Sequence, residues 1–105
     1  MSRADWAAAK QNLDDVEHAL VEAFTQGVKP GSAEANALAD RHRASLFYFD
    51  VTPAKHVILA RGYVEDARFT EHYEKLAEGL APWLRDIITE NARAYGVNPE
   101  TVTWG

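Results

Sequence analysis

The sequence predicts an all-α protein, a single bundle of about five helices in one domain that spans residues 1–105. Apolar residues recur at steps of three to four, which is the spacing of one helix face. Glycine and proline divide the chain into segments of helical length, and no segment alternates as a strand would. With 47% apolar residues, the chain can bury a core, which excludes disorder as its main state.

The first helix is expected over residues 3–26. Its apolar face consists of Trp6, Leu13, Val16, Leu20 and Phe24. Ser2 is placed to cap the first turn, with Asp5 as the reciprocal partner of a capping box. Gly27 follows the last apolar residue, where a left-handed C-cap favours glycine.

A second helix is predicted from Ser32, as its cap, to about Tyr48. Its stripe is Ala35, Leu38, His42, Leu46 and Phe49. Thr52 followed by Pro53 predicts the start of a third helix, because proline at the first helical position loses an amide that had no partner anyway. This helix is expected to end near Val64.

Residues 65–69 are expected to form a corner, after which Thr70 caps a short fourth helix that ends near Glu78. Pro82 suits the first turn of a fifth helix, which ends at Tyr95. The remaining residues are predicted to be loop.

Composition excludes several classes of function. The net charge is −5, divided as −3 over residues 1–50 and −2 over residues 51–105, so neither half offers the basic face that binding to nucleic acid needs. Cysteine is absent, which removes disulfides, thiolate metal sites and cysteine nucleophiles. Neither a secretory signal nor a span of about 20 apolar residues is found. The expectation is therefore a cytoplasmic protein without contact to a membrane.

Three residues offer a possible chemical site. His42 lies on the second stripe, Asp50 at the corner and His56 in the first turn of the third helix, so the corner can bring Asp50 near His56. Two histidines and a carboxylate can ligate a metal or form a base with its orienting group. The alternative is that the histidines are satisfied core residues and Asp50 is a helix cap. His18 and His72, each beside acidic residues, are expected to be solvated. We expect no cofactor and no metal.

Aromatic residues are dense in the middle of the chain. Phe47, Tyr48 and Phe49 are consecutive, so they cannot all face one core. The aromatic residues that follow in the next segments are Tyr63, Phe69, Tyr73 and Trp83. These residues either form a large core with scattered surface aromatics or line a concave apolar pocket of the kind that binds small molecules.

A series of short motifs extends along nearly the whole chain. It begins with Ala-Asp-Trp at 4–6 and continues with Asp-Arg-His-Arg at 40–43, Tyr-Phe-Asp at 48–50, Pro-Ala-Lys-His at 53–56, Gly-Tyr-Val-Glu-Asp-Ala-Arg-Phe-Thr at 62–70 and Glu-Gly-Leu-Ala-Pro-Trp-Leu-Arg-Asp-Ile-Ile at 78–88. In order and spacing these motifs are very similar to the TipAS family. That domain is the effector-recognition part of some MerR-type transcription regulators and also occurs as a free drug-sequestering protein.

The resemblance implies a globin-like helical fold with a cleft for large, rigid antibiotics such as thiopeptides. It implies that this chain is a small-molecule recognition domain and not an enzyme. The expected stacking surface is Phe49, Tyr63, Phe69 and Trp83, and the expected hydrogen-bonding groups are His42, Asp50 and His56. A buried histidine–aspartate pair would have a shifted histidine pKa, so that affinity would depend on pH near neutrality. Arg68 and Thr70 are expected to be structural.

Three departures from the family pattern modify this expectation. The helix-turn-helix and coiled coil of MerR regulators are absent from the sequence, so the chain is not expected to bind DNA by itself, whether it is free-standing or part of a longer regulator. Members that trap thiopeptides covalently carry a cysteine where this chain has Val51, so binding is expected to be reversible. The chain begins close to Trp6, without a long N-terminal segment, which predicts a more open site.

Two other functions remain open. The first is a protein-interaction or dimerisation domain that partners a transcription regulator, through exposed aromatic residues and with a homodimer as one form. The second is a hydrolase or metal enzyme built on His42, Asp50 and His56.

Overall fold

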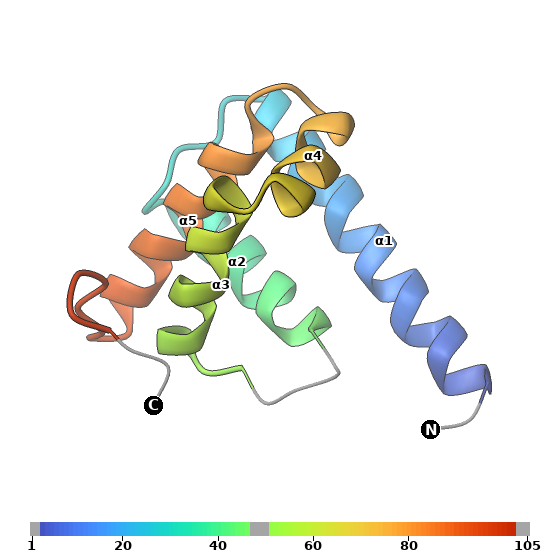
Figure 1. Ribbon diagram of the computed structural model, residues 1–105, viewed down its shortest axis with the longest axis horizontal. Coiled ribbons are helices and arrows are strands. Elements are labelled where there is room, and N and C mark those ends of the chain that lie inside the picture. The colour runs from blue at the N-terminus through green and yellow to red at the C-terminus, as the bar shows by residue number, and fades with distance from the viewer. Residues whose placement is uncertain (1–2, 47–50, 103–105) are drawn as a thin grey trace.

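The computed structural model describes residues 3–46 and 51–102, and this part of the chain consists of five α-helices without a strand, as the all-α prediction requires. The helices are α1 (Arg3–Thr25), α2 (Ala33–Ser45), α3 (Pro53–Glu65), α4 (Ala67–Leu76) and α5 (Leu80–Ala94). Helix α5 contacts each of the other four helices, and its most extensive contact is with α3 (Figure 1). In the described residues no helix is both long and apolar enough to cross a bilayer.

The core is built around α5, because this helix buries apolar residues at the spacing of one face. Its fully buried large side chains are Leu80, Leu84, Ile87 and Ile88. Against them pack Val16, Leu20 and Ala23 from the second half of α1. The first half of α1 extends away from the other helices along one edge of the molecule (Figure 1), and Trp6 on it is 55% exposed. The apolar stripe predicted for the first helix is thus buried over its C-terminal half.

Local capping signals fix three helix ends where the sequence predicts them. The amide of Ala35 donates to the Ser32 hydroxyl, and the amide of Lys55 donates to the Thr52 hydroxyl ahead of Pro53. Gly27 has φ 81°, the left-handed conformation expected at the end of the first helix. The predicted cap at Ser2 lies outside the described residues.

The predicted start of the fourth helix is wrong. The corner expected over residues 65–69 is reduced to Asp66, whose carboxylate accepts the Arg68 amide at 3.0 Å and caps α4 from there. The Thr70 hydroxyl instead donates to the carbonyl of Tyr63 at 2.8 Å, so Thr70 joins α4 to the end of α3 rather than capping a helix. Because Asp66 already serves as the cap, α4 begins three residues before Thr70.

Other boundaries differ by a few residues. Helix α2 ends at Ser45 rather than near Tyr48, and α4 ends at Leu76 rather than Glu78. Helix α5 begins at Leu80, so Pro82 lies in its first turn, as predicted. A carboxylate from α4 supports this turn: Glu74 accepts the amides of Gly79 and Ala81, both at 2.9 Å, which satisfies orphan donors of the first turn.

Candidate ligand-binding groove

A groove with a volume of about 440 Å³ lies between the middle of α1 and the α3–α4 pair. Its lining residues are Leu13, Glu17, Leu46, Tyr63, Arg68, Phe69, His72 and Tyr73. They come from α1, from the residue that follows α2, and from α3 and α4. A concave, largely apolar space with a few polar groups is the usual form of a small-molecule site.

Aromatic rings form one wall of this groove. The Tyr63 ring lies 4.8 Å from the Tyr73 ring and 5.8 Å from the Phe69 ring, measured between centroids. Tyr63 and Tyr73 are buried, whereas Phe69 is 47% exposed and therefore offers open ring surface. The TipAS-like motif at 62–70 thus supplies two of the three rings, because the short connection at Asp66 turns α4 back beside α3.

Two histidines and a tyrosine form a buried hydrogen-bonded chain behind this wall. Nδ1 of His42 lies 2.9 Å from Nε2 of His56, and Nε2 of His42 lies 3.2 Å from the Tyr73 hydroxyl. Both histidines are fully buried. This series of hydrogen bonds connects α2, α3 and α4, and its last member, Tyr73, lines the groove. Nδ1 of His56 has no hydrogen-bond partner among the described residues.

Burial keeps both imidazoles neutral. Loss of hydration lowers the pKa of His42 to about 4. The same cause, with added repulsion from His42 and Arg43, lowers the pKa of His56 to about 2. The predicted pH dependence near neutrality through a histidine–aspartate pair stays a prediction, because Asp50 lies outside the described residues.

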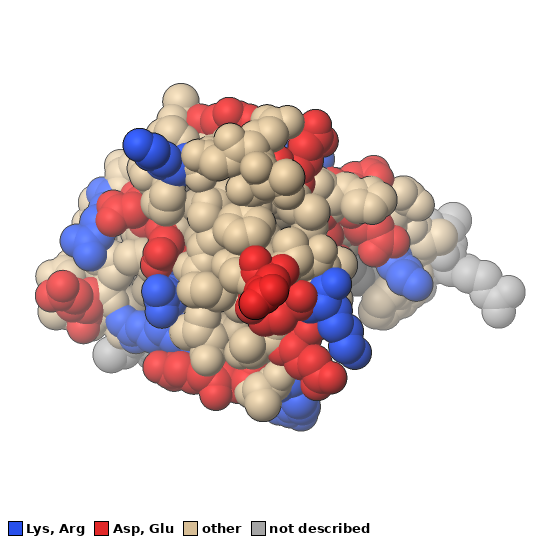
Figure 2. All heavy atoms as spheres, turned by 90° about the horizontal axis from the view of Figure 1, so that it is seen from above, with Lys and Arg blue, Asp and Glu red and all other residues tan. Residues whose placement is uncertain are grey.

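Polar groups border the open side of the groove. Nε2 of His72 lies 2.7 Å from a carboxylate oxygen of Glu17, which links α4 to α1. Arg68 pairs with Asp66 at 3.1 Å, and this pairing lowers the pKa of the Asp66 carboxyl. In a view from above Figure 1, aspartate and glutamate residues border much of the uncharged surface (Figure 2).

The structure brings together some of the predicted site residues. His42, His56 and Tyr63 lie in one cluster, with the His42 and Tyr63 rings 5.8 Å apart, and Phe69 continues it into the groove. Trp83 and Val51 are not among the residues that line the groove.

Trp83 packs against the end of α1 and the connection that follows it. Its indole nitrogen donates to the carbonyl of Val28 at 2.9 Å, and its ring lies 5.5 Å from that of Phe24. Phe49 and Asp50 lie outside the described residues. The metal or acid–base alternative on His42, Asp50 and His56 stays a prediction, and no group of three or more histidine, aspartate or glutamate residues in the described chain is arranged to hold a metal.

Sequence reasoning did not include Glu17, Leu13 or His72 in the site. Glu17 and His72 are 55 positions apart, so no local spacing connects them. The apolar stripe of α1 included Leu13 but carried no information about which of its members would face a groove. His72 was expected to be solvated, and its side chain is indeed 54% exposed, yet it is also paired.

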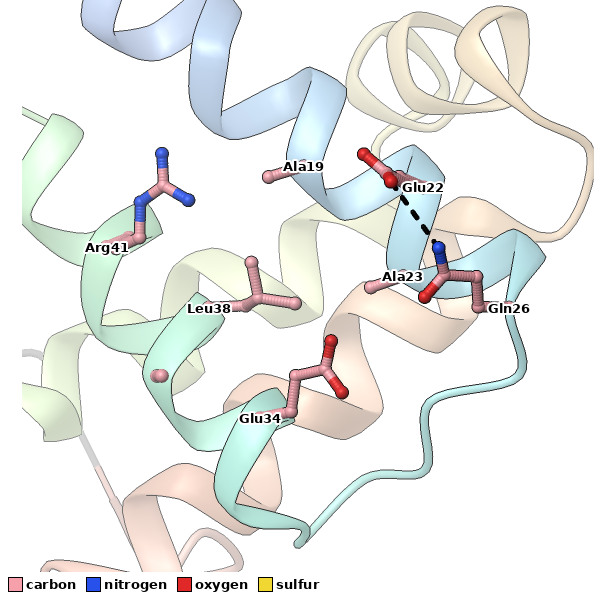
Figure 3. Close-up of a pocket in the computed structure, with 8 residues that line it drawn as sticks. Ala19, Glu22, Ala23, Gln26, Glu34, Leu38 and Arg41 are labelled. Carbon is pink, nitrogen blue, oxygen red and sulfur yellow. Dashed lines mark hydrogen bonds between the residues drawn. The ribbon is translucent and has the colours of Figure 1, made fainter.

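A second hollow, of about 320 Å³, lies between α1 and α2 on another part of the surface. Figure 3 shows Ala19, Ala23 and Leu38 at its floor, with Arg41 across from Glu22 and Gln26. The amide of Gln26 donates to Glu22 at 3.4 Å. The hollow contains no aromatic residue and none of the predicted site residues.

Comparison with known proteins agrees with the motif pattern. The TipAS antibiotic-recognition domain family matches residues 1–91. The chain is 29% identical over 93 residues to the HTH-type transcriptional activator TipA of Streptomyces coelicolor, and 30% identical over 94 residues to the HTH-type transcriptional regulator SkgA of Caulobacter vibrioides. Each match covers 87% of this chain and 37% of the relative.

The chain therefore spans a little over a third of the length of these curated relatives. No solved structure matches the chain, so the globin-like relation of the fold stays a prediction. The family match covers most of the chain and includes the rings and histidines around the groove. The chain belongs to the TipAS antibiotic-recognition domain family.

Proposed function

We propose that the chain binds an apolar, antibiotic-like small molecule reversibly in the groove between α1 and α4. The observation that carries the proposal is the aromatic wall of Tyr63, Phe69 and Tyr73, with the open ring of Phe69 over a space of about 440 Å³. Exposed aromatic surface in a concave site supplies binding energy through burial and stacking. Membership of an antibiotic-recognition family supports the same ligand class.

The sequence contains no cysteine, so the ligand is not captured through a thiol, and the proposed binding is reversible. Phe69 supplies the open stacking surface, Tyr63 packs against it in the wall, and the His56–His42 pair orients Tyr73 from behind. Phe49, Asp50 and Val51 remain proposed contributors, since they follow closely on Leu46, which lines the groove. Trp83 serves the fold through Val28 and Phe24 and is left out of the proposed contacts.

The relatives support a proposed biological role. TipA and SkgA are HTH-type transcription regulators, so this chain acts either as the effector-sensing domain of such a regulator or as a drug-sequestering protein. In either role it works in the cytoplasm as a non-enzymatic domain. It has no direct contact with nucleic acid, which agrees with a net charge of −5.

A thermal-shift screen against antibiotics, with thiopeptides included, tests the proposal. A ligand at 100 times its dissociation constant stabilises the folded state by about 2.7 kcal/mol, which raises the melting temperature by several degrees. Phe69→Ala is expected to abolish the shift. Leu76→Ala is the matched control, because Leu76 is also an exposed apolar residue of α4 but does not line the groove. An equal shift in both variants would place the ligand elsewhere.

A protein-interaction or dimerisation domain is the second candidate, favoured by the exposed apolar side chains of Leu76 and Tyr95 outside the groove. Static light scattering distinguishes the two functions. A mass that rises with protein concentration, together with no thermal shift across a wide library, would favour association over ligand binding.

A further inference from the structure

The carboxylate of Glu17 occupies an unusual place in the groove. It comes from α1, and its side chain is only 12% exposed. Within the described chain, its hydrogen-bond partner is His72 of α4, at 2.7 Å. A carboxylate withdrawn from water is stable only when it is paired. Glu17 therefore depends on a single neighbour whose own side chain is 54% exposed.

His72 is a replaceable partner. Histidine has no permanent charge, unlike lysine or arginine, so it neutralises a carboxylate incompletely. Its ring is half exposed and can turn into solvent, at the cost of one edge contact with the Tyr73 ring at 4.9 Å between centroids. A permanently cationic group that reached the same position would neutralise Glu17 better than the imidazole does.

The surroundings of Glu17 also favour a cation. Glu17 also borders a third hollow, between α1 and α4, in which Asp14 and Asp15 add two more carboxylates. The cation that lines the groove, Arg68, is held by Asp66, which offsets its charge locally. Aromatic rings attract cations as well.

From these contacts we infer that the groove is specific for an aromatic molecule that carries a cationic group, such as a primary ammonium. The cation displaces His72 and pairs with Glu17, while the aromatic part lies on Phe69. This inference rests on the proposed function, because it names the ligand class of the same groove. It assigns Glu17 as the residue that determines charge specificity, and His72 as the group that the ligand replaces.

Three probes with the same naphthalene ring and different charge test the inference. They are 2-naphthylmethylamine, which is cationic at pH 7, with 2-naphthylmethanol as the neutral and 2-naphthoate as the anionic counterpart. Binding is followed by amide chemical shifts in two-dimensional NMR of the whole chain. The amine is expected to bind about tenfold more tightly than the alcohol, and the carboxylate more weakly than either. The largest shifts are expected around Glu17, Phe69 and His72.

Variants then distinguish the effect of the Glu17 carboxylate from the effect of the other negative charges around it. Glu17→Gln is expected to reduce the preference for the amine over the alcohol to less than about twofold, and amide shifts away from the groove that stay as in the wild type show that the fold is intact. Asp14→Asn removes a carboxylate of α1 that does not line the groove and is expected to keep the preference. His72→Ala is expected to tighten binding of the amine, because the competing partner is gone.

The outcomes distinguish this inference from the proposed function. Equal binding of amine and alcohol at the groove would overturn the inference and leave the groove as a ligand site. The same loss of preference in Asp14→Asn as in Glu17→Gln would overturn the assignment of Glu17. If none of the three probes shifted any groove residue, the groove itself would be the wrong site, and both proposals would fail.

Discussion

His42 and His56 share a hydrogen bond of 2.9 Å inside the core, with their rings nearly parallel at 22°. The contact joins α2 to α3, and a second bond from His42 to Tyr73 extends it to α4. Neutral imidazoles can form such a chain because each offers one donor and one acceptor. The wall of the groove therefore depends on the protonation state of residues that no solvent reaches.

As the pH is lowered, the protein is expected to unfold at a higher pH than protonation of its carboxylates alone would cause. The pKa of His42 falls from 6.5 to about 4 on folding and that of His56 to about 2, so the unfolded chain takes up protons first. The contribution of the two buried histidines to the free energy of unfolding is complete above about pH 6.5 and is lost as the pH falls. At about 1.4 kcal/mol per pKa unit, His42 alone removes about 3 kcal/mol by pH 4.

Urea unfolding at pH 7.5, 6 and 5 measures this effect. The pKa values of Asp66 and Glu74 are lowered from 3.8 and 4.5, so these carboxylates add acid sensitivity only below that window. The double variant His42→Asn, His56→Asn is expected to show a flatter profile from a lower starting stability. A wild-type profile that is flat between pH 7.5 and 5 would contradict the buried neutral pair.

Truncation of His42 should be costly even at neutral pH. His42→Ala leaves a cavity and removes the partner of both His56 and Tyr73, and the expected loss is about 3 kcal/mol. His18→Ala, on the exposed side of α1, is the control and should change stability by less than about 0.5 kcal/mol. Chemical denaturation at pH 7.5 compares the two. Equal losses would mean that the buried hydrogen bonds contribute nothing.

Substitution of Phe69 and of Tyr63 by alanine should reduce stability by very different amounts, although their rings are in contact. Phe69 is half exposed, so Phe69→Ala is expected to cost about 1 kcal/mol rather than the roughly 3–5 kcal/mol of a core aromatic. Tyr63 is buried, and Tyr63→Ala should reach the larger value. The melting temperatures of the two variants test this difference. A large loss for Phe69→Ala would mean that its ring is core rather than binding surface.

Glu74 should stabilise α5 from outside the helix. Glu74→Ala removes the acceptor for the amides of Gly79 and Ala81 and is expected to cost about 1 kcal/mol. Glu78→Ala, at an exposed carboxylate nearby in sequence, is expected to have little effect. The comparison is made by denaturant unfolding at pH 7. A similar change in both variants would argue against the cap.

Sequence pattern was a good guide wherever the signal was local. Ser32, and Thr52 followed by Pro53, placed two helix starts because capping involves residues three positions apart. Asp66 and Thr70 are both good capping residues, and the choice between them depends on how α4 turns back on α3, which the local pattern does not contain.

Prediction of the site residues likewise succeeded where the signal was local and failed where it depended on the path of the chain. The TipAS-like motifs led to His42, His56, Tyr63 and Phe69, which the structure brings together. Glu17 and His72 form a pair only through the path of the chain between them, so their contact had no signature in the sequence. Trp83 was grouped with the groove on aromatic character alone, whereas its indole nitrogen is committed to the carbonyl of Val28.

The position of α5, in contact with every other helix, has a consequence for amide hydrogen exchange. Backbone amides around Leu84 and Ile88 should exchange only when the whole molecule opens, so that their rates report the global free energy of unfolding. Amides in the projecting first half of α1 should exchange through local fraying. A molecule bound between α1 and α4 would then slow exchange in α5 by its full binding free energy and exchange in α1 by no more than that, which gives an internal scale for ligand occupancy.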